Sequence, residues 1–96
     1  MIVNGFNLET ETPLWSLDVD GKKIAREFAF VDFKQAFEFM MLCAQYAEEI
    51  NHHPDWSNSW NKVMVELTTH SAGTLTALDI ELAKAMDAFA SKVSQN

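Results

Sequence analysis

The apolar positions of this 96-residue chain follow two periods, which predict strands in some stretches and helices in others. From Lys23 to Val31 apolar and polar residues alternate, with Ile24 and Phe28 on one face and Glu27 on the other. That pattern predicts a strand buried on one side. A short strand is expected before it, from Trp15 to Val19. The Asp20-Gly21 pair between them predicts a two-residue hairpin turn, because glycine tolerates the positive φ of such turns.

A long helix is predicted next, with Asp32 as its N-cap. Two apolar stripes run along it, so more than half of its girth is apolar. The first stripe, expected to be buried, consists of Phe33, Ala36, Phe37, Met40, Ala44 and Ala47. The second stripe, expected to pack within the chain or against a partner, consists of Phe39, Leu42, Cys43, Tyr46 and Ile50. Pro54 disfavours helical geometry at the residue before it, so the helix should end near residue 51 or 52.

The second half of the chain repeats the order of two strands and a helix. Residues 56–60 predict a short strand or turn, and residues 63–67 alternate as a half-buried strand. Gly73 breaks the chain, and Thr76 with Asp79 has the spacing of a capping box before a last helix that reaches about Val93. The predicted fold is α+β, a four-stranded antiparallel sheet with helices packed on one face, in β-β-α-β-β-α order. Residues 1–14 show no clear periodicity, and we expect residues 1–96 to form one domain.

Composition narrows the function classes. The net charge of −7 and the sequence pI of about 4.7 oppose binding to a phosphate backbone or an anionic membrane. A single cysteine, Cys43, allows no internal disulfide, and its apolar helical setting predicts a buried thiol. The N-terminus lacks the basic and apolar regions of a signal peptide, and no apolar stretch is long enough to span a bilayer. A cytoplasmic location is therefore expected.

All three histidines lie just beyond predicted elements: His52 and His53 after the long helix, and His70 after the strand of residues 63–67. Histidine can give and take a proton near neutral pH, so the group is a candidate for acid–base chemistry. Glu48 lies one helical turn before His52 and is expected to bond that imidazole. Adjacent helical residues point about 100° apart, so His52 and His53 are poorly placed to share a metal ion. No nucleophile-elbow pattern accompanies Ser71 or Thr69. Three histidines with structural roles at element ends stay an alternative.

The spacing of these residues resembles the signature of the pterin-4a-carbinolamine dehydratases, which in animals also act as dimerisation cofactors of a homeodomain transcription factor. The matching string is Glu48-x3-His52-His53-Pro54-x5-Trp60-x9-His70-x8-Asp79. The resemblance extends over about residues 15–92. Family members usually carry an N-terminal helix before the tryptophan strand, and that helix is apparently missing here.

The resemblance implies loss of water from a 4a-hydroxytetrahydropterin to give a quinonoid dihydropterin, in tetrahydrobiopterin recycling, with no metal and no organic cofactor. It implies His52, His53 and His70 as the proton-transfer set, with Glu48 supporting His52. The substrate-binding residues that it implies are Pro54, Thr69, Ser71, Trp60 and Asp79. Asp79 has a structural alternative, capping the last helix, and Trp56 and Trp60 are expected to pack rather than to stack on the pterin.

Two other functions compete with this one. The first is a non-catalytic interaction or dimerisation module, which would use the second stripe of the long helix as its docking surface. The second is a zinc-dependent hydrolase. A homodimer or homotetramer is expected, and by analogy alone the resemblance adds a transcription-factor partner and a nuclear location for a coactivator role.

Overall fold

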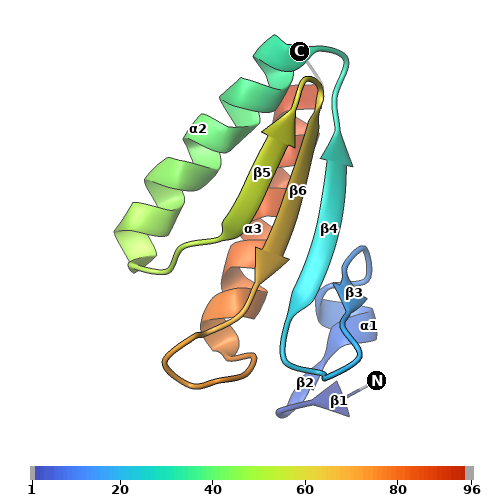
Figure 1. Cartoon of the computed structure of the whole chain (residues 1–96), viewed down its shortest axis with the longest axis vertical. Helices are drawn as coiled ribbons and strands as arrows, with labels where there is room; N and C mark the ends of the chain where they lie inside the picture. Colours follow the sequence, from blue (N-terminus) through green and yellow to red (C-terminus); the bar gives the residue numbers. More distant parts are fainter. Residues whose placement is uncertain (1, 95–96) are drawn as a thin grey trace.

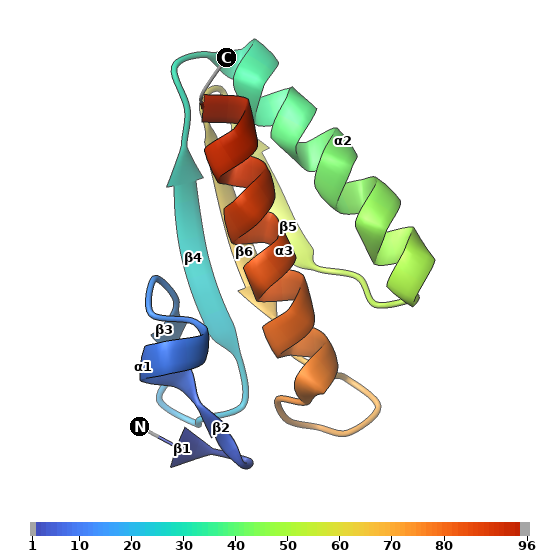
Figure 2. The same cartoon turned by 180° about the vertical axis from the view of Figure 1, so that it is seen from behind.

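Two long helices cover one face of a four-stranded antiparallel sheet, and the other face is open (Figures 1 and 2). The structure is a computed structural model that describes residues 2–94. The strands pair in the order β3-β4-β6-β5. The elements are β3 (Ser16–Leu17), β4 (Ile24–Ala29), α2 (Phe33–Ile50), β5 (Asp55–Ser59), β6 (Lys62–Leu67) and α3 (Ala77–Ser94). The predicted fold class is confirmed.

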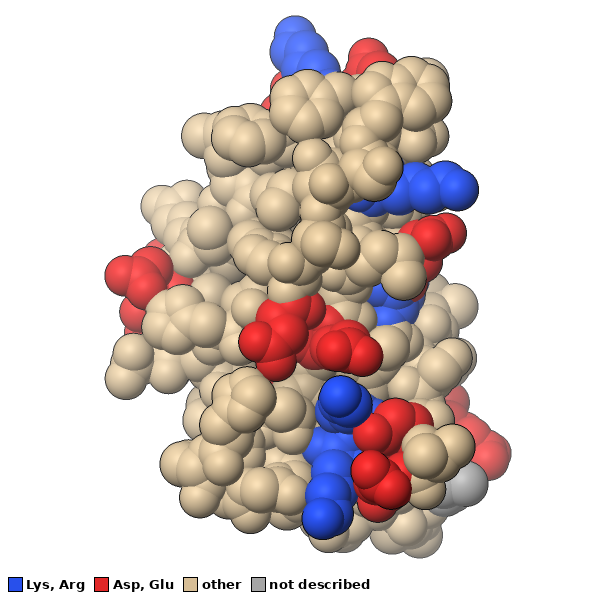
Figure 3. Space-filling view, in the orientation of Figure 1, with Lys and Arg blue, Asp and Glu red and all other residues tan. Residues whose placement is uncertain are grey.

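The core lies between the sheet and the two helices, and strand alternation explains which residues enter it. Ile24 and Phe28 of β4 are buried, as are Val63, Val65 and Leu67 of β6. Successive side chains of a strand point to opposite faces, so the residues between them face the open side. On that open side a small group of acidic side chains lies near the middle of a largely uncharged surface (Figure 3).

The connection between β3 and β4 is wider than the predicted two-residue turn. The Asp18 N–H donates to the Lys23 carbonyl at 3.0 Å, so residues 19–22 form a four-residue loop. The Asp18 side chain stabilises this loop, since its Oδ1 accepts from the N–H groups of Lys22 and Lys23 at 3.0 and 3.3 Å. Gly21, at φ +70°, provides the left-handed backbone inside it.

Helix α2 buries a different stripe from the one expected. Its buried residues are Ala36, Phe39, Cys43 and Ala47. Phe33, Phe37 and Ala44, assigned to the buried stripe from sequence, are exposed instead. Phe39 and Cys43 of the second stripe have no exposed surface, and Phe39 packs on Phe28 at 4.6 Å between ring centroids. Of the two alternatives for the second stripe, packing within the chain therefore holds for Phe39 and Cys43. The exposed apolar side of α2 is formed by Phe33, Phe37 and Met41.

A single helical turn precedes the tryptophan, where no helix was expected. The N-terminal elements are β1 (Ile2–Val3), β2 (Phe6–Asn7) and α1 (Leu8–Glu11). The Asn7 side chain caps α1 by accepting from the Glu9 N–H at 3.1 Å. Trp15 follows and is buried, with its indole N–H donating to Asp87 of α3 at 2.9 Å.

Two further sequence predictions concern Cys43 and the membrane. Cys43 is completely buried, and burial raises the pKa of its thiol to about 12. The helices within residues 2–94 are all too short or too polar to cross a membrane.

Candidate active site

The antiparallel pairing of β5 with β6 brings the histidine segments to one end of the sheet. Asp55, the first residue of β5, pairs with Glu66 near the end of β6. The chain just before β5 carries His52 and His53, and the chain just after β6 carries Thr69 and His70. Two segments that are separate in the sequence are thus adjacent in space.

The end of α2 determines where the first two imidazoles go. Asn51 follows the helix in a left-handed conformation with φ 52°, and the His52 N–H donates to the Ala47 carbonyl at 3.0 Å. This is a Schellman-type termination, in which asparagine can replace the usual glycine. It turns the chain sharply, so that His52 points toward α3 while His53 stays on the surface.

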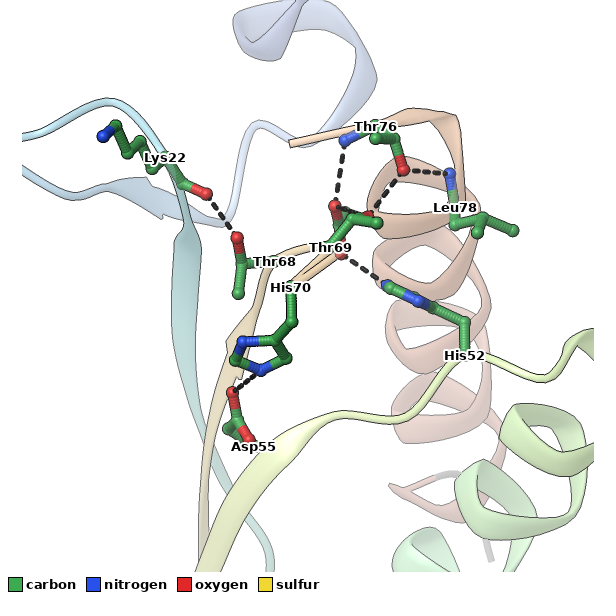
Figure 4. A network of polar contacts seen from close by, with 9 residues as sticks. Lys22, His52, Asp55, Thr68, Thr69, His70, Thr76 and Leu78 are labelled. Atoms are coloured by element: carbon green, nitrogen blue, oxygen red, sulfur yellow. Dashed lines mark hydrogen bonds and ion pairs between the residues drawn. The ribbon is translucent and has the colours of Figure 1, made fainter. Parts of the chain in front are cut away.

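His52 lies in a buried polar network with Asp79, which is in the first turn of α3. Figure 4 shows the His52 ring pointing toward Thr69. The distance from His52 Nε2 to Asp79 Oδ1 is 2.6 Å, and Asp79 has no exposed surface. The other oxygen of Asp79, Oδ2, accepts from the Thr69 hydroxyl at 2.8 Å and from the Thr76 N–H at 2.9 Å. Asp79 therefore caps α3, which was the structural alternative for this residue, and also binds His52.

The loop between β6 and α3 anchors Thr69 and exposes the residues after it. The Thr69 N–H donates to the Thr74 carbonyl at 3.1 Å, and the Gly73 N–H donates to the Thr69 carbonyl at 2.9 Å. Gly73, at φ +68°, lets the loop close on itself. His70 leaves this loop in the opposite direction from the network and points toward Asp55 of β5 (Figure 4).

The other two imidazoles are exposed, and each contacts a carboxylate. His53 Nε2 lies 2.5 Å from Glu48 Oε2, with 55% of the histidine side chain exposed. His70 Nε2 lies 3.2 Å from Asp55 Oδ2, with 77% of the histidine side chain exposed. The predicted pairing of Glu48 with His52 is wrong, because the turn at Asn51 takes His52 away from the helix and leaves His53 beside Glu48.

The remaining predicted site residues are scattered around this end or lie away from it. Pro54 is half-buried beside the histidines, and Ser71 is exposed in the loop. Trp60 lies at the other end of β5, about 17 Å from Asp55 at ~3.4 Å per residue. Trp60 is 65% exposed, so the expectation that it packs in the core is wrong. Its distance from Asp55 also keeps it away from the histidines of the same chain. Trp56 is half-buried and packs against the core.

A hollow of about 730 Å³ lies beside the site on the open side of the sheet. Asp55 and Trp56 contribute to its lining, whereas none of the three histidines does. No hydrogen bond or ion pair within residues 2–94 joins one imidazole to another. That part of the chain also contains no group of three His, Cys, Asp or Glu side chains placed to hold a metal ion.

Two residues of the site were not predicted to belong to it. Asp55 could have been found from sequence, because strand pairing places the start of β5 opposite the end of β6. Thr76 was expected only as a helix cap, yet its hydroxyl also lies 2.6 Å from that of Thr69. That contact between the two hydroxyls depends on the closed loop of residues 69–74. Gly73 is the residue of the sequence that indicates a turn there.

The fold and the site together define a small α+β domain with three imidazole–carboxylate pairs at one end of its sheet. Residues 6–89 match the profile of the family described as Pterin 4 alpha carbinolamine dehydratase. The chain belongs to that family.

Bacterial relatives support the same assignment, and each is provisionally named a pterin-4-alpha-carbinolamine dehydratase. One from Novosphingobium aromaticivorans is 49% identical over 82 residues, covering 85% of each chain. One from Mesorhizobium japonicum is 55% identical over 73 residues, covering 76% of this chain and 74% of the relative.

Solved structures share the fold. A transcriptional coactivator/pterin dehydratase from Brucella melitensis superposes with a TM-score of 0.78 at 45% identity, covering 80% of this chain and 82% of that one. A pterin dehydratase-like protein identified as a RuBisCO assembly factor in the alpha-carboxysome superposes with a TM-score of 0.71. At 21% identity, with 83% of this chain and 93% of that one covered, this second likeness concerns the fold alone.

Proposed function

We propose that this protein is a dehydratase that removes water from a 4a-hydroxytetrahydropterin and yields a quinonoid dihydropterin. The proposal includes a role in tetrahydrobiopterin recycling and a cytoplasmic location. The observation that carries it is that each histidine of this family member has its own carboxylate, as in the pairs His52–Asp79, His53–Glu48 and His70–Asp55. A carboxylate on one ring nitrogen orients the imidazole and leaves the other nitrogen for a substrate.

The reaction needs only proton transfers. The bond between C4a and its hydroxyl breaks, and a protonated imidazole gives the departing oxygen the proton that makes it water. N5 loses its proton to a neutral imidazole, and the electron pair left on N5 forms the new C4a–N5 double bond. Atoms and charge balance without an oxidant or reductant, and general acid–base catalysis accounts for the rate.

The roles assigned from sequence change with the geometry. His52, His53 and His70 stay the proton-transfer set, and Glu48 now supports His53. Pro54 and Ser71 stay the proposed pterin contacts, and both lie at the same end of the sheet as the histidines. Asp79 has no exposed surface and Thr69 is buried, so we assign both a supporting role rather than direct contact with the substrate.

Turnover of the carbinolamine by purified protein tests this function. His53→Ala and His70→Ala should each lower kcat by about 10²- to 10⁴-fold, the usual contribution of general acid–base catalysis. Both variants should keep the fold, because both side chains are largely exposed. His70→Gln should be as slow as His70→Ala, since glutamine can hydrogen-bond to Asp55 but cannot exchange a proton near neutral pH.

Lys62→Ala is a suitable control, because this exposed residue begins β6 at the opposite end of the sheet. It should turn over like the wild type. Absence of any acceleration by the wild-type protein, or full activity in both alanine variants, would rule out the proposed function.

A second function, self-association, is favoured by the exposed side of α2. Phe33, Phe37 and Met41 lie four residues apart along that side and are 47%, 50% and 60% exposed. Contiguous exposed apolar side chains typically mark an interaction surface. A second copy of this chain is the occupant that we propose, giving the homodimer or homotetramer expected from sequence.

Sedimentation velocity of Phe37→Glu tests self-association. The wild type should sediment as an oligomer, and the charged variant should shift toward monomer, because a carboxylate would have to be buried in the interface. Glu38→Gln is the matched control on the same helix and should sediment like the wild type. A monomeric wild type would contradict this second role without bearing on turnover.

A further inference from the structure

The hydrogen bonds around Asp79 fix the direction of every proton in the buried network. Thr69 has one hydroxyl proton, and it donates this proton to Asp79 Oδ2. The Thr69 oxygen must then accept in its 2.6 Å contact with the Thr76 hydroxyl. The Thr76 oxygen accepts in turn from the Leu78 N–H at 3.3 Å. The chain of donors runs from the first turn of α3 to the carboxylate.

The donors around Asp79 favour its ionised form. Its Oδ2 receives two donors, the Thr69 hydroxyl and the Thr76 N–H. The carboxylate also lies at the N-terminus of an 18-residue helix, where the helix dipole favours negative charge. An ionised carboxylate has no proton to give, so the 2.6 Å contact with Oδ1 requires a proton on His52 Nε2.

The second ring nitrogen of His52 lies outside the buried hydrogen-bond network. Nδ1 has no hydrogen-bond partner within residues 2–94, whereas no fully buried side-chain nitrogen or oxygen of that part of the chain lacks one. Nδ1 is consequently not fully buried, although the residue as a whole is only 8% exposed. The ring thus has one nitrogen in the buried network and one nitrogen without a partner among the described residues.

We propose that His52 keeps a proton on Nε2 throughout the reaction and exchanges protons only through Nδ1, and that Thr69 and Thr76 are the positioning residues that maintain this state. The catalytic part of the inference rests on the proposed function, whereas the location of the proton is a property of the protein alone. Thr69 and Thr76 act through Asp79 and do not touch the substrate.

Nitrogen-15 NMR of histidine-labelled wild-type protein at a pH of about 8 tests the proton location directly. The His52 signals, assigned by their loss in His52→Gln, should show Nε2 protonated. Nδ1 should be the nitrogen whose shift changes as the pH is lowered. A neutral His52 with the proton on Nδ1 would overturn the inference, whatever the turnover of the protein.

Asp79→Asn gives the sharpest variant. Thr69 and Thr76 both donate toward the Oδ2 position, so the amide oxygen should take that place and the amide NH₂ should face His52. His52 Nε2 would then have to accept, which moves the ring proton to Nδ1. A comparable aspartate-to-asparagine change in a serine protease triad lowers kcat by about 10⁴-fold through the wrong tautomer. We expect a loss of about 10²- to 10⁴-fold in kcat here, with KM little changed.

The threonines are tested by a matched pair. Thr69→Val should lower kcat more than it changes KM, and Thr69→Ser should restore the wild-type rate because serine keeps the hydroxyl. Thr68→Val is the control, since the neighbouring Thr68 hydroxyl donates instead to the Lys22 carbonyl at 2.6 Å. An Asp79→Asn protein with the wild-type tautomer and wild-type kcat would overturn the proposal. A protein with the expected tautomer but no dehydratase activity would overturn the proposed function alone.

Discussion

Each of the three imidazoles contacts a carboxylate, yet their surroundings differ. The side chain of His52 is 10% exposed and its partner Asp79 is buried, whereas the other two pairs are open to water. Exposed ion pairs contribute little to stability, typically about 0–1 kcal/mol. The His53 and His70 pairs are therefore expected to contribute little to the stability of the fold. His52 belongs to the architecture as well as to the proposed chemistry, since it links the end of α2 to the start of α3.

The sequence located these histidines but mispaired one of them. The spacing of Glu48 and His52, four residues apart, fits one helical turn, and the predicted end of the helix was near residue 51 or 52. In the structure α2 ends at Ile50, and Asn51 after it is left-handed. The left-handed conformation of Asn51 thus moves the Glu48 contact from His52 to His53. The hydrophobic pattern of the sequence does not predict this conformation.

Cys43 gives a residue-scale prediction that depends on pH. Burial raises the pKa of its thiol to about 12, so at pH 8 only about one native molecule in 10⁴ carries a thiolate. Iodoacetamide should leave the native protein unmodified at pH 8 and alkylate it rapidly in denaturant. Rapid alkylation of the native protein would contradict the buried position.

The same raised pKa has a consequence for stability. The ordinary value for the thiol is 9.0, so between about pH 9 and pH 12 the unfolded state has lost a proton that the native state keeps. The free energy of unfolding should therefore fall as the pH rises through this range. Urea denaturation at pH 8 and pH 10 measures the effect, and Cys43→Ala should lack this part of it.

At the scale of elements, strands were easier to predict than the face of α2. A strand has only two faces, and in β4 the charged Glu27 shows which of them is open. Helix α2 is apolar over most of its girth. The pattern therefore predicts burial of Phe33 and Phe37 as readily as burial of Phe39 and Cys43. The buried side is selected by contact with the sheet and α3, as in the packing of Phe39 on Phe28 and Phe30.

For the whole molecule, the sequence predicted the order of the strands and helices and the layer arrangement, but not the N-terminal segment. The first fourteen residues of the sequence have no periodicity, and the described part of them, residues 2–14, makes contacts with residues distant in the sequence. The Asn4 amide donates to Thr74 and to the Leu75 carbonyl at 2.8 and 3.1 Å. Such contacts fasten the segment to the loop that carries His70, and they cannot be read from local pattern.

The structure of the protein with a reduced pterin tests the central claim most directly. We predict that the pterin lies against the end of the sheet where β5 begins and β6 ends, with C4a and N5 within hydrogen-bond reach of the imidazoles. His52 should present Nδ1 to it, and His53 or His70 should contact the opposite side of the reacting bond. A pterin bound elsewhere, out of reach of all three imidazoles, would contradict the account.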